Sequence, residues 1–339
     1  MNVNELETTA RAIVAPGKGI LAADESQPTI EKRFKSAGIP NTEENRRAYR
    51  QMLFTTKGAA EFVSGVILYD ETIRQKADDG TPLAEVLSKQ GTIPGIKVDK
   101  GTRPLALHAG EQITEGLDGL QGRLAEYRGL GARFAKWRAV ITIGDGIPSR
   151  TCIGANAQAL ARYAALCQQE GIVPIVEPEV LMDGGHTIER CYEVTEATLD
   201  ALFHALHEHR VVLEGTLLKP NMVLSGKECP RQAGVAEVAA ETVKCFRRVV
   251  PSAVPGIVFL SGGQSDEVAT GHLDAMNRMG SHPWQLSFSY GRALQAPAIK
   301  AWSGNPANLA AGQKAYLHRA RMNGAARYGK YTASMETAA

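Results

Sequence analysis

Eight short apolar runs recur along the chain, and segments with helical periodicity separate them. The runs are apolar on both faces, which is typical of parallel strands covered by helices on both sides. One connecting segment carries Leu160, Tyr163, Ala164 and Cys167 on a single helical face, and Gly171 follows as a stop signal. The eight runs are residues 19–24, 64–69, 93–100, 134–143, 173–180, 214–223, 256–263 and 284–291.

Eight strand–helix units favour a closed (β/α)₈ barrel over an open doubly wound sheet. An open sheet more often has fewer strands and a glycine-rich phosphate fingerprint, and the chain has neither GxGxxG nor a Walker A motif. No linker, low-complexity tract or charge run divides the 339 residues. We therefore expect an α/β protein with one TIM-barrel domain over residues 1–339, of which 332–339 form a short C-terminal tail.

The charge balance, the apolar runs and the cysteine spacing exclude several classes of binding partner. The chain has 38 Lys and Arg against 36 Asp and Glu, a balance that lacks the basic excess of a nucleic-acid-binding protein. No run of about 18 apolar residues could span a bilayer, and the first residues do not resemble a signal peptide. The five cysteines are widely spaced without a CxxC pair, which argues against a disulfide framework or a thiolate zinc site. We expect a cytoplasmic protein with no nucleic-acid or membrane partner.

Charged residues gather toward the carboxyl ends of five runs, where barrel enzymes place their chemistry. Three pairs are spaced i, i+2, so both members of each pair point to the same face of their strand. We expect this face to be the barrel interior, where four positive and four negative groups can compensate one another. Structural ion pairs, or strands turned by one residue toward the helices, are the alternatives. The eight groups are Asp24, Lys97, Asp99, Lys136, Arg138, Glu177, Glu179 and Lys219.

Two lysines in this set point to a reaction. If Lys136 and Lys219 come close, each disfavours protonation of the other, and burial acts in the same direction. One amine can then be neutral and nucleophilic near pH 7. This pattern predicts Schiff-base chemistry.

The last two runs predict an anion site. Ser261-Gly262-Gly263 ends the seventh run with exposed backbone N–H groups, and Gly291-Arg292 ends the eighth with a guanidinium. Barrels commonly bind phosphate after strands seven and eight, and arginine can donate two hydrogen bonds to it. A simple turn is the alternative for the serine and two glycines alone.

A second anion site is predicted after the first run. Ser26, Thr29 and Arg33 follow Asp24 at the expected start of a helix, where backbone N–H groups favour anions. Ordinary helix capping by the two hydroxyl groups explains the same pattern and stays open.

A metal site is the less favoured interpretation of the histidines. His204, His207 and His209 lie at i, i+3 and i+5, which cannot all face one ion on a straight helix. We expect an amphipathic surface helix there and no metal ligands. Trp137, between two inward-facing charges, is expected to pack outward against the helices.

Residues 211–221, VVLEGTLLKPN, resemble the Schiff-base signature of class I fructose-bisphosphate aldolases. The resemblance extends from about Thr9 to Tyr331 and implies a (β/α)₈ barrel. It further implies a cytoplasmic homotetramer of glycolysis and gluconeogenesis, a lyase without metal or cofactor. Such enzymes reversibly cleave the phosphosugar fructose 1,6-bisphosphate to dihydroxyacetone phosphate and glyceraldehyde 3-phosphate. Further matching stretches are GILAADES (19–26), NTEENRRAYR (41–50), QKADDGTPL (75–83), GIKVDKG (95–101), FAKWR (134–138), PIVEPE (174–179), FLSGGQS (259–265) and SYGRALQ (289–295).

The resemblance assigns roles to residues of this sequence. Lys219 corresponds to the Schiff-base nucleophile, and Glu177 to the general acid and base of carbinolamine formation and dehydration. Glu179 and Lys136 would shape the protonation of these two groups. Asp24 would stay charged and help to deprotonate or orient the C4 hydroxyl.

The resemblance also assigns one substrate phosphate to each of the two anion sites. Ser261, Gly262 and Arg292 correspond to ligands of the ketose-side phosphate. The distal phosphate would contact Ser26, Thr29, Arg33 and Lys97. Arg138, Gly263, Ser289 and Gly291 complete the expected substrate-binding set.

Two departures from the family qualify these assignments. The stretch from Ser26 to Thr29 differs from the vertebrate form, which weakens the inferred hydroxyl contacts to the distal phosphate. Residues 332–339 contain no counterpart of the tyrosine that eukaryotic members use in proton exchange, so barrel residues or water are expected to serve instead. Two other functions stay open. One is a phosphosugar-binding scaffold without catalysis, and the other is an aldolase that prefers a monophosphate such as fructose 1-phosphate.

Overall fold

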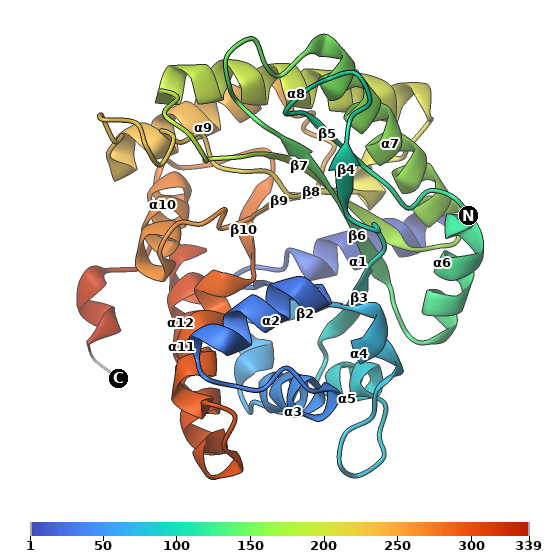
Figure 1. The fold of residues 1–339 in the computed structure, drawn as a ribbon, viewed down its shortest axis with the longest axis vertical. Coiled ribbons are helices and arrows are strands. Elements are labelled where there is room, and N and C mark those ends of the chain that lie inside the picture. The colour runs from blue at the N-terminus through green and yellow to red at the C-terminus, as the bar shows by residue number, and fades with distance from the viewer. Residues whose placement is uncertain (1, 338–339) are drawn as a thin grey trace.

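Eight parallel strands close into a barrel at the centre of the fold (Figure 1). The structure is a computed structural model that describes residues 2–337. The order around the barrel is β1-β10-β9-β8-β7-β6-β3-β2, so the first and last strands pair, with Ile20 opposite Ser289. The predicted (β/α)₈ barrel is confirmed. Its strands are β1 (Gly19–Ala23), β2 (Val63–Leu68), β3 (Ile93–Lys97), β6 (Phe134–Ile141), β7 (Val173–Val180), β8 (Leu217–Leu218), β9 (Gly256–Phe259) and β10 (Gln285–Tyr290).

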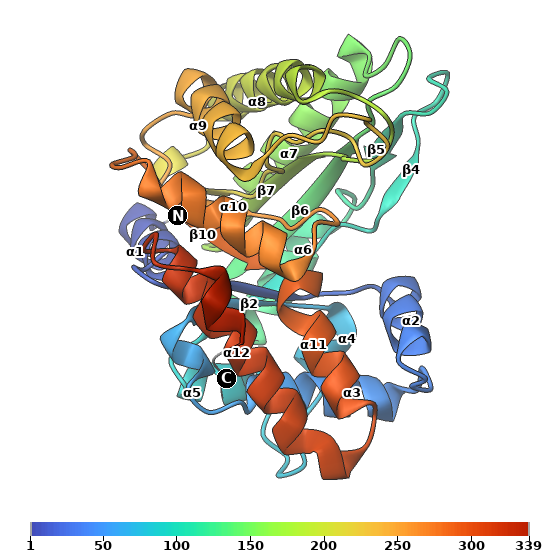
Figure 2. The same cartoon turned by 90° about the vertical axis from the view of Figure 1, so that its left-hand side faces the viewer.

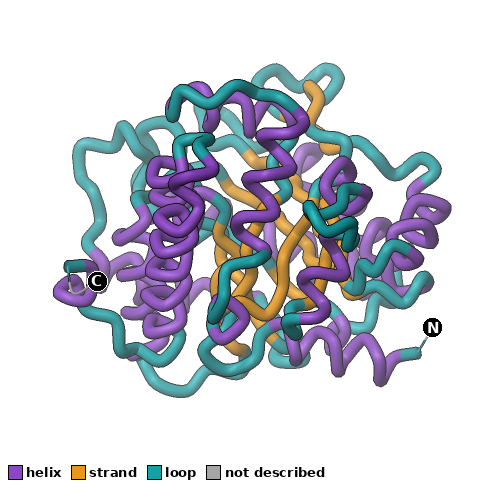
Figure 3. Tube along the Cα trace, turned by 90° about the horizontal axis from the view of Figure 1, so that it is seen from below, coloured by secondary structure: helices purple, strands orange, loops and turns teal. Residues whose placement is uncertain are grey.

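Helices surround the barrel, as seen in Figure 3. Every residue of β1, β2 and β7 is buried, because these strands face the interior on one side and helices on the other. The helices are α1 (Val3–Ile13), α2 (Gln27–Ser36), α3 (Glu43–Phe54), α4 (Asp70–Arg74), α5 (Leu83–Lys89), α6 (Leu120–Gly129), α7 (Arg150–Gln169), α8 (Ile188–Glu208), α9 (Val235–Val249), α10 (Asp266–Arg278), α11 (Arg292–Trp302) and α12 (Leu309–Ala326).

The helical periodicity is confirmed in α7. Leu160, Tyr163 and Cys167 are buried on its inner face, and Gly171, with φ of 69°, follows the helix in the left-handed region that suits glycine. The indole of Trp137 packs outward against Tyr163, with ring centroids 5.6 Å apart, as expected.

The sixth run differs from the expected strand. Only Leu217 and Leu218 form β8, and Leu213–Gly215 make a 3₁₀ turn before it. Pro220 has no N–H to extend the ladder. The backbone nevertheless keeps barrel register beyond β8, because Lys219 N–H donates to the Val176 carbonyl at 2.8 Å. The strand is therefore shorter than residues 214–223, but Lys219 still lies at its end.

Two features were not marked by the apolar runs. A hairpin of β4 (Thr102–Pro104) and β5 (Gln112–Thr114) is inserted in the chain between β3 and β6, which still pair with each other in the barrel. After α12 the chain forms a 3₁₀ turn, η4 (Ala333–Glu336), which lies against α12 (Figure 2). Among residues 2–337, no helix combines the length and apolar character needed to cross a membrane.

Candidate active site

A cavity of about 530 Å³ opens at the carboxyl ends of the barrel strands. It brings together all five expected catalytic residues and all of the expected binding residues. The charged groups therefore point into the barrel, as the i, i+2 spacing predicted, and not toward the helices. The predicted residues that line it are Asp24, Ser26, Thr29, Arg33, Lys97, Asp99, Lys136, Arg138, Glu177, Glu179, Lys219, Ser261, Gly262, Gly263, Ser289, Gly291 and Arg292.

Glu177 lies between the two lysines on the cavity floor. Its Oε1 is 3.1 Å from Nζ of Lys219, and its Oε2 is 3.5 Å from Nζ of Lys136. Lys136 also contacts Asp24, with Nζ 2.8 Å from Oδ2. The side chains of Lys136, Glu177 and Lys219 are all at most 5% exposed, so water screens these contacts little. The arrangement places a buried amine beside a carboxylate that can exchange protons with it.

The carboxylates decide the charge of Lys136. Burial would lower its pKa, but Asp24, Glu177 and Asp99 together outweigh burial and raise it. Of the two lysines, Lys136 is therefore not the one that can be neutral near pH 7. Burial likewise acts to raise the pKa of Asp24, but Lys136 and Lys219 hold it well below its ordinary value. Lys136 and Asp24 form a charged pair beside Lys219.

A second layer of ion pairs lies above the floor. Lys97 Nζ is 2.5 Å from Asp99 Oδ1, and Arg138 contacts Glu179. Burial acts to raise the pKa of Asp99, but Lys136 and Lys97 bring it below its ordinary value. These pairs compensate the buried charges, as the equal numbers of acids and bases predicted.

The phosphate corner, Ser261 to Gly263 with Gly291 and Arg292, has the expected backbone geometry. Gly262 and Gly263 have φ of 56° and 98°, a conformation that favours glycine and exposes successive N–H groups. Nearby, the hydroxyl of Ser289 is buried and has no hydrogen-bond partner among the described residues. A ligand in the cavity would satisfy it.

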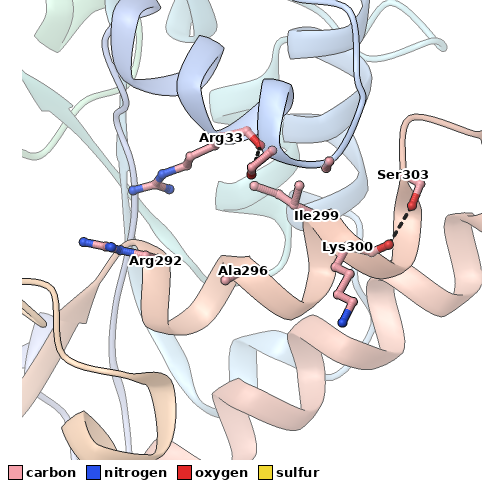
Figure 4. Close-up of a pocket in the computed structure, with 8 residues that line it drawn as sticks. Arg33, Arg292, Ala296, Ile299, Lys300 and Ser303 are labelled. Atoms are coloured by element: carbon pink, nitrogen blue, oxygen red, sulfur yellow. Dashed lines mark hydrogen bonds between the residues drawn. The ribbon is translucent and has the colours of Figure 1, made fainter.

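Arg33 lies nearer this corner than its place after the first strand suggested. Its Nη2 is 3.3 Å from where a Cβ on Gly291 would stand, so a larger residue there would crowd it. Figure 4 shows Arg33 and Arg292 extending toward the same side from α2 and α11, at the edge of a side pocket of about 440 Å³. Arg33 therefore lies beside the phosphate corner and also lines the main cavity.

The second anion site lies at the start of α2. Ser26 and Thr29 share a hydrogen bond between their hydroxyl oxygens, 3.1 Å apart, and the side chain of Ser26 makes no capping bond to the helix. The capping alternative is thus not supported for Ser26. Both hydroxyls line the same cavity as Lys97.

Two further charged residues belong to the site, and no sequence pattern marks them. Glu25 is buried between Arg33 and Arg50, and its Oε2 is 2.5 Å from Nη2 of Arg50. Lys227 lines the cavity and extends over Gly263, where its Nζ is 2.8 Å from Asp183. The arginine-rich stretch 46–50 indicates that a buried acid could be needed nearby. Only the fold shows that this acid is Glu25.

The histidine segment forms the predicted surface helix. His204 lies on α8 and is mostly exposed, with Nε2 3.3 Å from Oε1 of Glu208. Over residues 2–337, no three His, Cys, Asp or Glu side chains are grouped so as to hold a metal ion.

The comparisons with known proteins agree with this site. The family model of class I fructose-bisphosphate aldolases matches residues 5–339. The chain belongs to this family. A probable class 1 fructose-bisphosphate aldolase of Xanthomonas campestris is 62% identical over 98% of this chain and 99% of its own length. The aldolase 1 of Toxoplasma gondii is 56% identical over 96% of this chain and 91% of its own.

Solved structures give the same result. The fructose-bisphosphate aldolase of Plasmodium falciparum, solved in complex with TRAP and a small-molecule inhibitor, superposes with a TM-score of 0.96. It is 51% identical, over 97% of this chain and 95% of its own. The resemblance found in the sequence is confirmed, and with it the class of enzyme: a metal-independent lyase that acts on phosphosugars.

Proposed function

We propose that this aldolase cleaves fructose 1,6-bisphosphate through a Schiff base on Lys219. The observation that supports this most is the 3.1 Å contact between Nζ of Lys219 and Oε1 of Glu177 inside a buried, charged cavity. A general base must lie within hydrogen-bond reach of the group that it deprotonates. Glu177 meets that condition for Lys219.

The reaction begins with attack of the Lys219 amine on the C2 ketone. Glu177 takes a proton from the attacking amine and returns one to the carbinolamine hydroxyl, which leaves as water. The product is an iminium at C2. Lys136 stays charged beside Glu177 and balances the carboxylates while these protons move.

Cleavage then uses the iminium as an electron sink. The charged carboxylate of Asp24 accepts the hydrogen of the C4 hydroxyl, the C3–C4 bond breaks, and its electron pair moves into the iminium to give an enamine. Glyceraldehyde 3-phosphate leaves first. A proton at C3 and hydrolysis by water release dihydroxyacetone phosphate and restore the free Lys219 amine.

The phosphates anchor the substrate at two ends of the cavity. The phosphate corner, with the free Ser289 hydroxyl, binds the ketose-side phosphate, and Ser26, Thr29 and Lys97 bind the distal one. Arg33 reaches between them. Because Lys97 gives the distal end a cation of its own in addition to the arginines at the phosphate corner, a bisphosphate is favoured over a monophosphate.

We further propose a single-domain chain that assembles as a cytoplasmic homotetramer and serves glycolysis and gluconeogenesis. The family resemblance over nearly the whole chain supports this. Sedimentation equilibrium tests the assembly, and a mass other than four chains would contradict it.

The decisive experiment traps the intermediate. The protein is incubated with dihydroxyacetone phosphate, reduced with borohydride and digested, and the modified peptide is identified by mass spectrometry. The expected result is one adduct, on Lys219. An adduct on another lysine would contradict the nucleophile, and no adduct in a protein that still binds the ligand would favour the non-catalytic scaffold.

A further inference from the structure

The C-terminal turn η4 packs on the core through Met335 and is bonded to α12 and Tyr331 through the carboxylate of Glu336. Glu336 accepts hydrogen bonds from the Tyr331 hydroxyl at 2.9 Å and from Arg319, and His318 Nε2 lies 2.8 Å from its Oε2. Burial acts to raise the pKa of Glu336, but the bonds from Arg319 and His318 bring it below its ordinary value. Glu336 is therefore charged near neutral pH and held by three side chains.

Arg319 connects this carboxylate to two other helices. It lies on α12, is 3% exposed, and donates to the Asp266 carbonyl at 3.0 Å and to the Ala293 carbonyl at 3.3 Å. Its Nη2 also donates to the Thr270 hydroxyl at 2.6 Å. Asp266 is the first residue of α10, and Ala293 is the second of α11. One guanidinium thus joins the starts of both helices.

Both helix starts lie directly after the phosphate corner. Asp266 follows Gly263 by three residues, and Ala293 is bonded to Arg292. A displacement of either first turn would move a backbone N–H or a guanidinium that faces the cavity. Hydrogen bonds to charged groups are strong enough to hold such turns, and small misplacements of binding groups weaken binding.

We propose that Glu336 is a positioning residue for phosphate binding, because it fixes the guanidinium of Arg319 between the first turns of α10 and α11. The inference rests on the proposed binding of the ketose-side phosphate at this corner. Glu336 is not among the residues that line the cavity. Its effect is on affinity, and the chemical step at Lys219 is left nearly unchanged.

The test measures phosphate affinity and turnover separately. Glu336→Gln keeps the shape of the side chain but removes its charge. We expect KM for fructose 1,6-bisphosphate, and the inhibition constant of inorganic phosphate, to rise about threefold to tenfold while kcat stays within about twofold. Glu336→Asp should recover part of the affinity. Thr337→Ala, an exposed change in the same tail, is the matched control and should leave both constants unchanged.

Thermal unfolding separates positioning from stability alone. If Glu336→Gln lowers the melting temperature but leaves both phosphate constants unchanged in the folded enzyme, the proposal is wrong. Arg292→Ala tests the underlying assignment. Unchanged phosphate inhibition in Arg292→Ala would overturn the corner itself, whereas an effect there with none in Glu336→Gln would overturn only the role of Glu336.

Discussion

Glu177 contacts both lysines of the cavity, Lys219 and Lys136. It lies within 3.1 Å of Lys219 and 3.5 Å of Lys136, and both contacts are buried. Lys136 is surrounded by acids that keep it charged, whereas Lys219 has only Glu177 as an ion-pair partner among the described residues. This difference in surroundings, more than the number of lysines, supports the proposed assignment of Lys219 as the nucleophile.

Replacement of Lys219 tests the nucleophile directly. Lys219→Ala should lower turnover by at least about 10³-fold, because the covalent route through an iminium is lost. Steady-state cleavage and borohydride trapping measure this together. Residual trapping on the variant would identify a different lysine.

Replacement of Lys136 tests its electrostatic role. Lys136→Met roughly keeps the length but removes a positive charge close to Lys219, so the ammonium form of Lys219 becomes less unfavourable. The pH at which Lys219 becomes reactive should therefore rise, as followed by the rate of imine trapping across the pH range. An unchanged pH profile would show that the two amines are not coupled.

At the scale of elements, Glu25 joins three pieces of the fold. It follows β1 and pairs with Arg33 of α2 and Arg50 of α3, and both Glu25 and Arg50 are almost fully buried. Burial acts to raise the pKa of Glu25, but the two arginines hold it below its ordinary value. The ion pairs of Glu25 with Arg33 and Arg50 therefore hold α2 and α3 against the end of β1, and so help to place Arg33 in the cavity.

Loss of this carboxylate should be costly. Glu25→Gln leaves Arg50 buried without an ionised partner, and we expect the free energy of unfolding to fall by about 3 kcal/mol. Because the pKa of Glu25 is lower in the folded state, its contribution is present above its unfolded pKa and is lost as pH falls through the folded value. Urea unfolding at neutral and acidic pH measures both effects. A variant whose deficit did not shrink in acid would contradict this account.

The tail gives a second prediction at this scale. Residues 333–336 fold against α12, and the one acid among residues 332–337, Glu336, is bonded to Arg319. Removal of residues 332–339 should change kcat for cleavage by less than about tenfold, or about 1.4 kcal/mol of barrier, while KM rises as in Glu336→Gln. Tritium exchange into dihydroxyacetone phosphate is the second measurement. A loss of exchange by orders of magnitude in a folded truncated enzyme would show that the tail carries the proton.

At the scale of the whole molecule, the proposed iminium takes the place of a metal ion. A protonated Schiff base withdraws electrons as a Lewis acid would, so the barrel needs no bound cation for cleavage. Activity should be unchanged after exhaustive dialysis against a chelator. Loss of activity in chelator that zinc restores would contradict this prediction.

Much of this molecule follows from local sequence patterns. The eight apolar runs predict the barrel, because strand and helix periodicities depend on residues close in sequence. The i, i+2 spacing of Lys136 and Arg138, and of Glu177 and Glu179, predicts that these charges share the barrel interior. The positions of Lys219 and the phosphate corner at strand ends follow from the same pattern, and the family resemblance supplies their roles.

Only the tertiary structure decided which charges meet. Asp24 and Lys136 are far apart in sequence, and their 2.8 Å contact exists because β1 and β6 close onto one cavity. The pairs Glu25–Arg50 and Glu336–Arg319 likewise join residues of different elements that meet only in the folded chain. Ion pairing depends on distances of a few ångströms between side chains from different elements, and no local periodicity encodes those distances. The sequence therefore determined the set of charged groups and the end of the barrel where they gather, whereas the closed barrel determined their partners and hence their protonation.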